Sequence, residues 1–249
     1  MLSQPFISII TVTYNAREAL AVTLKSVAAQ TFSDYEYLVI DGGSSDGTVE
    51  LLKNSCPPVS RWISEKDNGL YEAMNKGIGM AKGKYLLFLN AGDYFYSSDV
   101  LEKIAGLPGE ADVYYGQTMI VDSTGKELGL RRLKAPEHLC WKNLLYGMLV
   151  CHQSFLVKKE IAPLYDLQYH ITSDYDWMIR CLKKSSATVY TGLIISSFTD
   201  GGLNKKRMFT GLKERFLIMK KHFGLFKTLC VHLYFPFRFF FYYLRHGRV

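Results

Sequence analysis

The chain has 249 residues, of which 48% are hydrophobic, 21% are charged and only seven are prolines. This composition is that of a globular protein, and it excludes a disordered or collagen-like chain. The length suits one large domain, or one domain with an appendage. The net charge of +7 is unevenly spread, because residues 201–249 hold 11 lysines and arginines and one acid, whereas residues 1–200 hold 19 bases and 22 acids. We therefore expect any polyanionic partner to bind the C-terminal tail.

The cysteines form an odd, scattered set without a C-x-x-C pair: Cys56, Cys140, Cys151, Cys181 and Cys230. This spacing argues against a disulfide framework or a zinc site and indicates a reducing compartment. The first residues lack the basic segment of a signal peptide. No run of about 18 uncharged apolar residues occurs, so no ordinary membrane span is predicted.

Short apolar, β-branched runs in the first hundred residues indicate strands, and helical spacing of apolar residues separates them. The expected strands span residues 7–12, 35–40, 61–64 and 85–89. The expected helices span residues 17–29, a segment from about 48, and residues 70–81. Asn15 is suited to cap the first helix. This alternation predicts βαβ units and a mostly parallel sheet, an α/β fold.

Three aspartates, Asp41, Asp67 and Asp93, follow successive expected strands at even intervals of 26 residues. The carboxyl ends of parallel strands share one edge of a sheet, where open α/β proteins bind their ligands. We therefore expect the three carboxylates to gather at one site. The alternative for each is a structural role, as a helix cap or in a turn.

The alternation is less regular in the second half of the chain. Strands are expected at residues 112–116, 118–121 and 153–158, and a helix at residues 173–182 that Ser173 or Asp174 begins. The first strand is followed by neither a P-loop nor a G-x-G-x-x-G motif, so the sequence lacks the signature of nicotinamide or P-loop binding. The glycine-rich turn at residues 41–47 instead permits close approach of backbone to a ligand.

Four motifs occur in the order found in family 2 glycosyltransferases, and the chain resembles that family over about residues 5–105. The motifs are residues 9–15 (IITVTYN), 39–48 (VIDGGSSDGT), 67–78 (DNGLYEAMNKGI) and 83–93 (GKYLLFLNAGD). The resemblance implies a GT-A fold that binds a nucleotide sugar. It is strongest to the bacterial subgroup that builds exopolysaccharide, O-antigen or capsule units, including colanic-acid-type transferases.

The resemblance implies a role for each matched polar residue on the donor side. The residues assigned to the donor nucleotide sugar are Thr13, Tyr14, Asn15, Asp41, Asp67, Asn75 and Asn90. Among these, Asp41 should meet the base or ribose, and Asp67 and Asn75 should lie near the base and diphosphate.

Asp93 should occupy the last position of the family's metal-binding acidic motif. A divalent cation, Mn²⁺ or Mg²⁺, would bridge the diphosphate and neutralise the charge that develops as it leaves. The chain departs from the pattern here, because Asn90 and Gly92 stand where many relatives carry further acids.

The second half resembles the acceptor side of the subgroup at residues 151–155 (CHQSF) and 172–177 (TSDYDW). By this resemblance Asp174 is the general base that takes a proton from the attacking sugar hydroxyl. Asp176 is the alternative base, and a third possibility is that Asp174 only caps its helix while Asp176 faces solvent. The residues assigned to the acceptor are His152, Gln153, Asp176 and Trp177. A structural role for His152 remains an equal alternative.

The tail combines basic residues with an apolar stripe at helical spacing and then a dense aromatic run at residues 234–243. A basic, aromatic, amphipathic segment is typical of an interfacial membrane anchor rather than of a nucleic-acid-binding tail. We expect residues 225–249 to contact an anionic membrane surface, and residues 212–223 to pack at least partly on the domain. The chain thus divides into a GT-A domain over residues 1–204, with a donor part (1–105) and an acceptor part (106–204), and a tail over residues 205–249.

The expected function is inverting transfer of a sugar from a nucleoside-diphosphate sugar to a hydroxyl of a lipid-linked saccharide, in bacterial surface polysaccharide synthesis. The expected location is the inner face of the plasma membrane, on the cytoplasmic side. Two alternatives remain at this point: a nucleotidyltransferase, and a membrane-bound nucleotide-sugar-binding protein without transferase activity.

Overall fold

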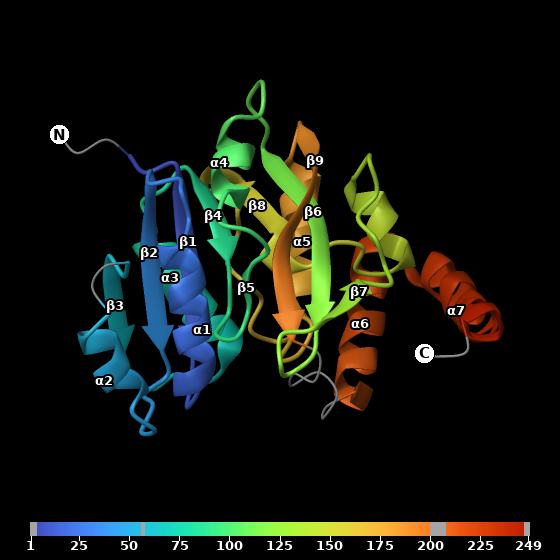
Figure 1. Ribbon diagram of the computed structural model, residues 1–249. Helices are drawn as coiled ribbons and strands as arrows, with labels where there is room; N and C mark the ends of the chain where they lie inside the picture. The colour runs from blue at the N-terminus through green and yellow to red at the C-terminus, as the bar shows by residue number, and fades with distance from the viewer. Residues whose placement is uncertain (1–3, 56–57, 200–207, 247–249) are drawn as a thin grey trace.

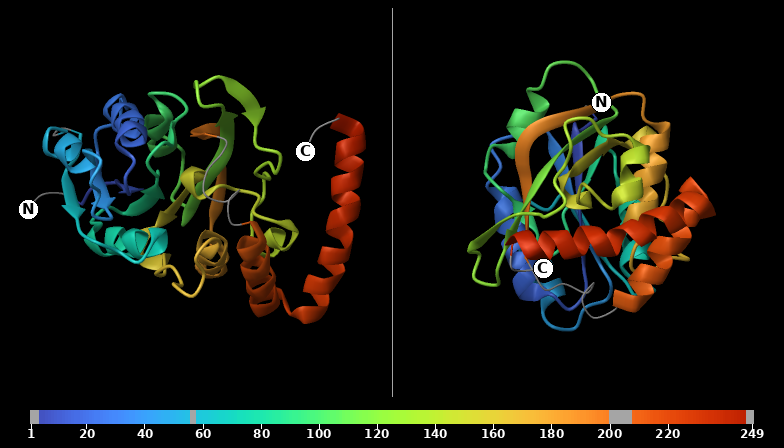
Figure 2. Two further views of the ribbon diagram at one scale, coloured as in Figure 1. Left: turned by 90° about the horizontal axis from the view of Figure 1, so that it is seen from below. Right: turned by 90° about the vertical axis from the view of Figure 1, so that its right-hand side faces the viewer.

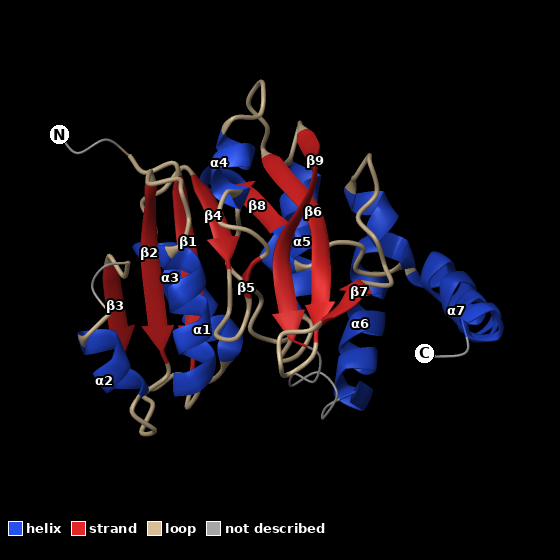
Figure 3. Ribbon diagram, viewed as in Figure 1, coloured by secondary structure: helices blue, strands red, loops and turns tan. Residues whose placement is uncertain are grey.

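A computed structural model describes residues 4–55, 58–199 and 208–246, and it describes residues 236–246 by their backbone (Figure 1). A central sheet runs through the molecule with helices against its faces (Figure 3). Its strands are β1 (Ile7–Thr13), β2 (Tyr35–Asp41), β3 (Arg61–Ser64), β4 (Tyr85–Phe88), β5 (Tyr94–Phe95), β6 (Val113–Val121), β7 (Glu127–Leu130), β8 (Phe155–Lys158) and β9 (Thr188–Thr199).

The α-helices lie between and after these strands. They are α1 (Arg17–Ala28), α2 (Thr48–Lys53), α3 (Leu70–Met80), α4 (Val100–Ala105), α5 (Ser173–Lys184), α6 (Met208–Phe223) and α7 (Leu225–His246). Three short 3-10 helices complete the described elements: η1 (Trp141–Tyr146), η2 (His152–Ser154) and η3 (Lys159–Ile161).

The first half of the sheet is parallel, as the alternation of strands and helices predicts. Strands follow the order β3-β2-β1-β4, and every pair in this set is parallel. The register pairs Thr13 of β1 with Asp41 of β2, and Asp41 with Ser64 of β3. The carboxyl ends of these strands therefore meet at one edge, at the bottom of Figure 1.

The second half of the sheet is mixed, in agreement with the less regular alternation of expected strands and helices there. Strand β8 is antiparallel to both β4 and β6, whereas β6 and β9 are parallel. The two strands expected at residues 112–121 form one strand, β6, because its irregular register with β9 lets it continue past Gly116. The strand expected to begin at residue 153 begins at Phe155, since residues 152–154 form η2.

Two hydrophobic clusters cover the two faces of the sheet. Helices α1 and α4 bury Leu20 and Leu101 against one face. Helices α3, α5 and α6 bury Met74, Trp177 and Ile218 against the other. Because both faces are covered, the strands of the parallel half are apolar along nearly their whole length.

Helices α1 and α5 begin at the expected residues 17 and 173, but the predicted cap of α1 differs from the structure. Ala16 precedes α1 as its N-cap, and Asn15 instead adopts a left-handed conformation with φ of 46°. Thr172 precedes α5, so Asp174 is the second residue of that helix. The side chains of Asn15 and Asp174 instead contact residues outside these helices, Ser45 and His152 respectively.

The tail forms two helices joined at Gly224, and the first of them belongs to the folded body (Figure 2). On α6, Ile218 and Met219 are fully buried in the cluster that contains Trp177. The Phe223 ring stacks on Trp141 at a centroid distance of 5.5 Å. Helix α6 is thus part of the hydrophobic core on that face of the sheet. Lys205, Lys206 and Arg207 of the expected basic segment lie outside the described residues.

Candidate functional site

The loops after β1 and β2 are fastened to each other at the carboxyl edge of the sheet. The Asn15 side-chain oxygen accepts a hydrogen bond from the Ser45 N–H at 2.9 Å, and the Asn15 N–H donates to the Ser44 hydroxyl at 2.7 Å. The Gly42 N–H donates to the carbonyl of Thr13 at 2.9 Å. These bonds hold the glycine-rich turn in one conformation beside Thr13 and Tyr14.

Asp41 organises this turn from inside. Its carboxylate is fully buried and accepts hydrogen bonds from the N–H groups of Gly43 (3.1 Å) and Ser44 (2.9 Å) and from the hydroxyls of Ser44 and Ser64. No surface of the side chain faces a ligand in this arrangement. These bonds give Asp41 a structural role in the turn, and its contact with a base or ribose stays a prediction.

We call the loops after β1 and β2 together with Asp67 the donor edge, after the role that the resemblance implies for them. Tyr14 and Asp67 form its accessible part. The Tyr14 residue is 64% exposed. A Cβ atom on Gly42 would lie 2.8 Å from an Asp67 carboxylate oxygen and 3.3 Å from a Tyr14 ring carbon. Glycine at position 42 thus lets the two side chains converge on the turn.

Asn75 joins α3 to the segment at residues 162–170. Its amide nitrogen donates to the Tyr165 carbonyl at 3.0 Å, and its amide oxygen accepts from the Tyr165 N–H at 2.7 Å. Both polar atoms of the amide are thus engaged with the backbone of the 162–170 segment. The position of Asn75 near the base and diphosphate stays a prediction.

A second group of polar side chains comes from three segments that are distant in the sequence. The Gln153 amide donates to the Asp93 carboxylate at 2.8 Å. The neighbouring His152 ring lies 3.5 Å from the Asp174 carboxylate through Nδ1 and 3.2 Å from the Asn90 amide through Nε2. We call Asn90, Asp93, His152, Gln153 and Asp174 the catalytic edge. The adjacent residues His152 and Gln153 thus contact Asp174 and Asp93, respectively.

The two carboxylates of the catalytic edge have opposite electrostatic environments. Burial raises the pKa of Asp93 to about 6, although the Gln153 amide and the nearby His152 act against the increase. Burial would also raise the pKa of Asp174, but the His152 ring and the Tyr175 N–H together hold that pKa below its ordinary value. Asp174 is therefore ionised at neutral pH, whereas burial dominates the pKa of Asp93.

The oxygen atoms at the catalytic edge suit a divalent cation that binds together with the phosphates of a substrate. In the part of the chain that the structure describes, no three His, Cys, Asp or Glu side chains form a metal-binding group. However, the Asn90 side-chain oxygen is buried without a hydrogen-bond partner, as is the Thr13 hydroxyl on the adjacent strand. A cation such as Mg²⁺ binds through one or two protein oxygens together with substrate phosphates, and Asp93 with Asn90 provides such a pair.

Asp176 and Trp177 point away from the catalytic edge, which corrects their assignment to the acceptor. The fully buried Asp176 carboxylate contacts His222 at 2.8 Å, Arg180 at 2.5 Å and Lys221 at 3.3 Å. The Trp177 ring is also fully buried and donates to the Pro163 carbonyl at 2.7 Å. Helical geometry explains the difference between Asp174 and Asp176, since residues two apart in a helix face different sides.

Tyr71 contacts the catalytic edge, although the sequence did not single it out. Its hydroxyl donates to the Ile171 carbonyl at 2.9 Å and lies 3.3 Å from the Asp174 carboxylate. Burial and the Asp174 charge raise the pKa of Tyr71 well above its ordinary value, so the hydroxyl remains a donor. The only signal in the sequence was its position within the motif at residues 67–78.

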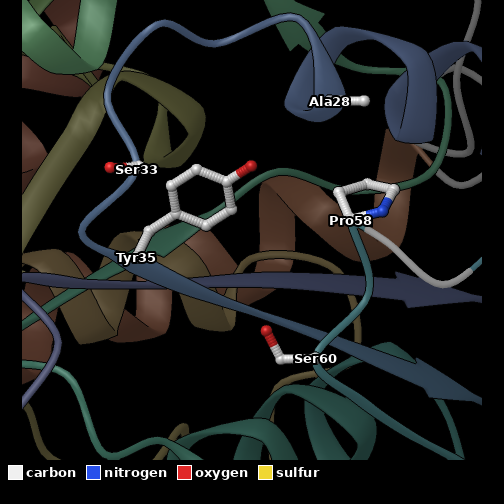
Figure 4. Close-up of a pocket in the computed structure, with 5 residues that line it drawn as sticks. All are labelled: Ala28, Ser33, Tyr35, Pro58 and Ser60. Carbon is white, nitrogen blue, oxygen red and sulfur yellow. The ribbon is translucent and has the colours of Figure 1, made fainter.

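The pocket in Figure 4 is separate from both edges. Its lining residues are Ala28, Ser33, Tyr35, Pro58 and Ser60. Because β2 begins at Tyr35 and β3 begins at Arg61, this pocket lies at the amino ends of these strands, opposite the candidate site.

Comparisons with known proteins agree with this geometry. The model of the glycosyl transferase family 2 matches residues 8–162. A "PGL/p-HBAD biosynthesis glycosyltransferase" of Mycobacterium tuberculosis is 32% identical over 215 residues, which cover 82% of this chain and 80% of the relative.

Solved structures share the fold at low sequence identity. Residues 1–349 of TarS from S. aureus give a TM-score of 0.70 with 15% identity, covering 92% of this chain and 72% of TarS. The mannosyltransferase PcManGT from Pyrobaculum calidifontis, in complex with GDP-Man and Mn²⁺, gives a TM-score of 0.64 with 15% identity, covering 93% of this chain and 71% of that one. The fold is therefore that of GT-A proteins, and the family match shows that this chain belongs to glycosyl transferase family 2.

Proposed function

We propose that this glycosyltransferase moves a sugar from a nucleoside-diphosphate sugar to an acceptor hydroxyl with inversion, and that Asp174 is its general base. The observation that carries the proposal is the arrangement of Asp174 on His152, next to Asp93 and Gln153, at the carboxyl edge of the sheet. TarS has been crystallised with UDP-GlcNAc and PcManGT with GDP-Man, which supports a nucleotide-sugar donor for the shared fold.

Inversion follows from the presence of one positioned base. The oxygen of the acceptor hydroxyl attacks the anomeric carbon while the ionised Asp174 carboxylate accepts the proton of that hydroxyl. The nucleoside diphosphate leaves from the opposite face. The Tyr71 hydroxyl and His152 ring hold the carboxylate in place. A single displacement of this kind inverts the anomeric configuration.

Asp93 and Asn90 would hold the divalent cation. Such a cation neutralises the negative charge that develops on the leaving diphosphate. Gln153 orients the Asp93 carboxylate through its 2.8 Å hydrogen bond, which leaves the other carboxylate oxygen without a contact to Gln153. The presence of Mn²⁺ in the PcManGT complex supports this part of the proposal.

The proposed acceptor is a lipid-linked saccharide at the cytoplasmic face of the membrane, in the synthesis of a bacterial surface polysaccharide. No helix in the described part of the chain is both apolar and long enough to cross a bilayer. The support comes from α7, where Phe226 and Leu233 are 80% and 72% exposed next to the exposed Lys227. Basic residues beside exposed apolar ones suit the surface of an anionic membrane.

The experiment for catalysis compares two neighbouring carboxylates of α5. Release of nucleoside diphosphate is measured with UDP-GlcNAc and GDP-mannose, with and without Mn²⁺, at a temperature well below the melting transition. We expect Asp174→Asn to lower turnover by about 10²- to 10⁴-fold, as loss of a general base does, while donor affinity is retained. The matched variant Asp176→Asn should keep turnover within about threefold of wild type on the same scale. Near-normal turnover by Asp174→Asn would refute the base assignment.

The experiment for membrane contact uses sedimentation with vesicles of phosphatidylcholine, with or without about one-third phosphatidylserine. The wild type should sediment only with the anionic vesicles. The double variant Phe226→Ser and Leu233→Ser should bind at least about tenfold more weakly, because each buried apolar side chain contributes about 1.5–3 kcal/mol. Val22→Ser is the control, since Val22 is 48% exposed on α1, at the end of the molecule away from α7 (Figure 1). Equal sedimentation of the double variant and wild type would contradict membrane contact through α7.

A further inference from the structure

Glu214 is the one acidic residue among residues 201–249, and α6 buries it against the body of the protein. Its carboxylate accepts hydrogen bonds from three consecutive backbone N–H groups, those of His170 at 2.8 Å, Ile171 at 2.9 Å and Thr172 at 3.0 Å. The Thr172 hydroxyl donates to it as well, at 3.1 Å. One side chain of the tail thus satisfies every one of these donors in the turn before α5.

This turn carries the candidate base. Thr172 is the N-cap of α5, and Asp174 is the second residue of that helix. The Thr172 side chain makes no cap within its own helix, because its hydroxyl is directed to Glu214. A carboxylate at this position satisfies N–H groups near the helix start and interacts favourably with the positive end of the helix dipole.

The approach of α6 to this turn depends on Gly211, one helical turn before Glu214. A Cβ atom at position 211 would lie 3.3 Å from a methyl carbon of Ile171 and 3.8 Å from a methyl carbon of Thr172. The first of these contacts is tighter than ordinary packing, so a small residue at position 211 keeps the helix close enough for Glu214 to reach the backbone.

The turn is held from its other side by α3. The Tyr71 hydroxyl donates to the Ile171 carbonyl at 2.9 Å and lies 3.3 Å from the Asp174 carboxylate. The segment that ends in Asp174 therefore lies between two buried contacts, one from the nucleotide-binding half of the chain and one from the tail.

We propose that Glu214 is a positioning residue for Asp174, so that helix α6 is part of the catalytic architecture and not only a link to the membrane. The proposal rests on the proposed function, because it takes Asp174 as the base. A displacement of about 1 Å at a reacting group can lower a rate by about 10²-fold, which gives the size of effect that loss of the clamp can have.

The ion network around Asp176 offers a matched control for general docking of α6. Asp176 also joins α5 to α6, through His222 and Lys221, but its carboxylate faces away from Asp174. Asp176→Asn therefore weakens the same helix interface without touching residues 170–172.

The test measures kcat and KM for release of nucleoside diphosphate from UDP-GlcNAc or GDP-mannose, together with hydrogen exchange of peptides over residues 168–176. Glu214→Ala should lower kcat by about 10²-fold with little change in KM for the donor, and it should speed exchange at residues 170–172. Glu214→Gln keeps one acceptor oxygen but turns its amide donor toward a backbone N–H, so its kcat should lie between those of Glu214→Ala and wild type. Asp176→Asn should lower the melting temperature while it leaves kcat and the exchange of residues 170–172 near wild type.

Three outcomes overturn the positioning role. They are unchanged kcat in Glu214→Ala, an equal loss of kcat in Glu214→Ala and Asp176→Asn, and unchanged exchange at residues 170–172 in Glu214→Ala. The last comparison needs no substrate, so it is able to overturn the positioning role even where the wild type accepts neither donor. Failure of the proposed function has a different signature, which is normal turnover by Asp174→Asn.

Discussion

The donor edge and the catalytic edge of the sheet differ in how their polar groups are held. At the donor edge, the Asp41 carboxylate is saturated by donors from its own turn and from Ser64 on the adjacent strand. At the catalytic edge, Asp93 and Asp174 depend on side chains about 60 and 20 residues away, Gln153 and His152, and the Asn90 oxygen has no partner. The donor edge is therefore a scaffold whose polar groups are paired within the protein. The catalytic edge leaves hydrogen-bonding groups free for a ligand, which lowers stability.

The largest effect is expected at the scaffold. Asp41→Ala leaves two backbone N–H groups and two hydroxyls without their acceptor, which should lower the free energy of unfolding by about 3–5 kcal/mol. Asp41→Asn keeps an acceptor oxygen and presents its amide to the Ser44 hydroxyl, so it should cost about 1 kcal/mol. Urea unfolding of both variants measures the difference. Equal losses would show that charge, rather than the hydrogen bonds of the turn, holds the donor edge.

At the catalytic edge, by contrast, we expect a substitution to raise the free energy of unfolding. The raised pKa of Asp93 stabilises the fold below about pH 4, and this contribution is lost as the pH rises through about 6. A neutral Asn retains it, so Asp93→Asn should raise the free energy of unfolding at pH 7 by up to about 3 kcal/mol.

The same Asp93→Asn variant should lose Mn²⁺-stimulated turnover, since the proposed cation ligand loses its charge. The gain in stability is measured by thermal unfolding at pH 5 and pH 7, and the increase in melting temperature should be smaller at pH 5. A variant that is less stable than wild type at pH 7 would remove the contrast between the two edges.

A smaller effect is expected at the interface of α5 with α6. Burial would raise the pKa of Asp176, but His222, Arg180 and Lys221 hold it at about 2. The depressed pKa contributes stability that is present above about pH 4 and lost as the pH falls toward 2.

Asp176→Asn should therefore lower the free energy of unfolding at pH 7 by about 2 kcal/mol and flatten the stability profile between pH 4 and pH 2. Asp34→Asn, a change at an exposed carboxylate, is the control and should leave both unchanged. If the free energy of unfolding of Asp176→Asn still falls as steeply between pH 4 and pH 2, the acid sensitivity belongs to other carboxylates.

The smallest effect is expected at the exposed ring of the donor edge. Tyr14→Ala should raise the KM for the nucleotide sugar by about tenfold, because stacking of a base on an aromatic ring contributes about 1–3 kcal/mol. Tyr14→Phe should behave as wild type, and neither variant should change the melting temperature since Tyr14 is 64% exposed. A KM that is unaffected in Tyr14→Ala would move the base elsewhere on the edge.

The sequence alone determined the parallel half of the sheet and the edge where its acids lie. Residues 7–13, 35–41, 61–64 and 85–88 form strands close to their expected bounds, because buried parallel strands are short apolar runs that local composition reveals. Asp67 and Asp93 follow from the same pattern, since the end of each strand sets the position of the next loop. The family could be predicted for the same reason, as its motifs are local.

The tertiary structure decided which side chains of the second half meet the site. Strand β9 was missed and β6 was divided in two, because their pairings join segments about 75 residues apart and leave no periodic signal that a short window detects. Asp174 and Asp176 look alike in sequence, yet the rotation of α5 gives one to the catalytic edge and the other to α6. Glu214 appeared only as a lone acid in a basic tail, and its contacts with residues 170–172 depend on the packing of two helices against one sheet face.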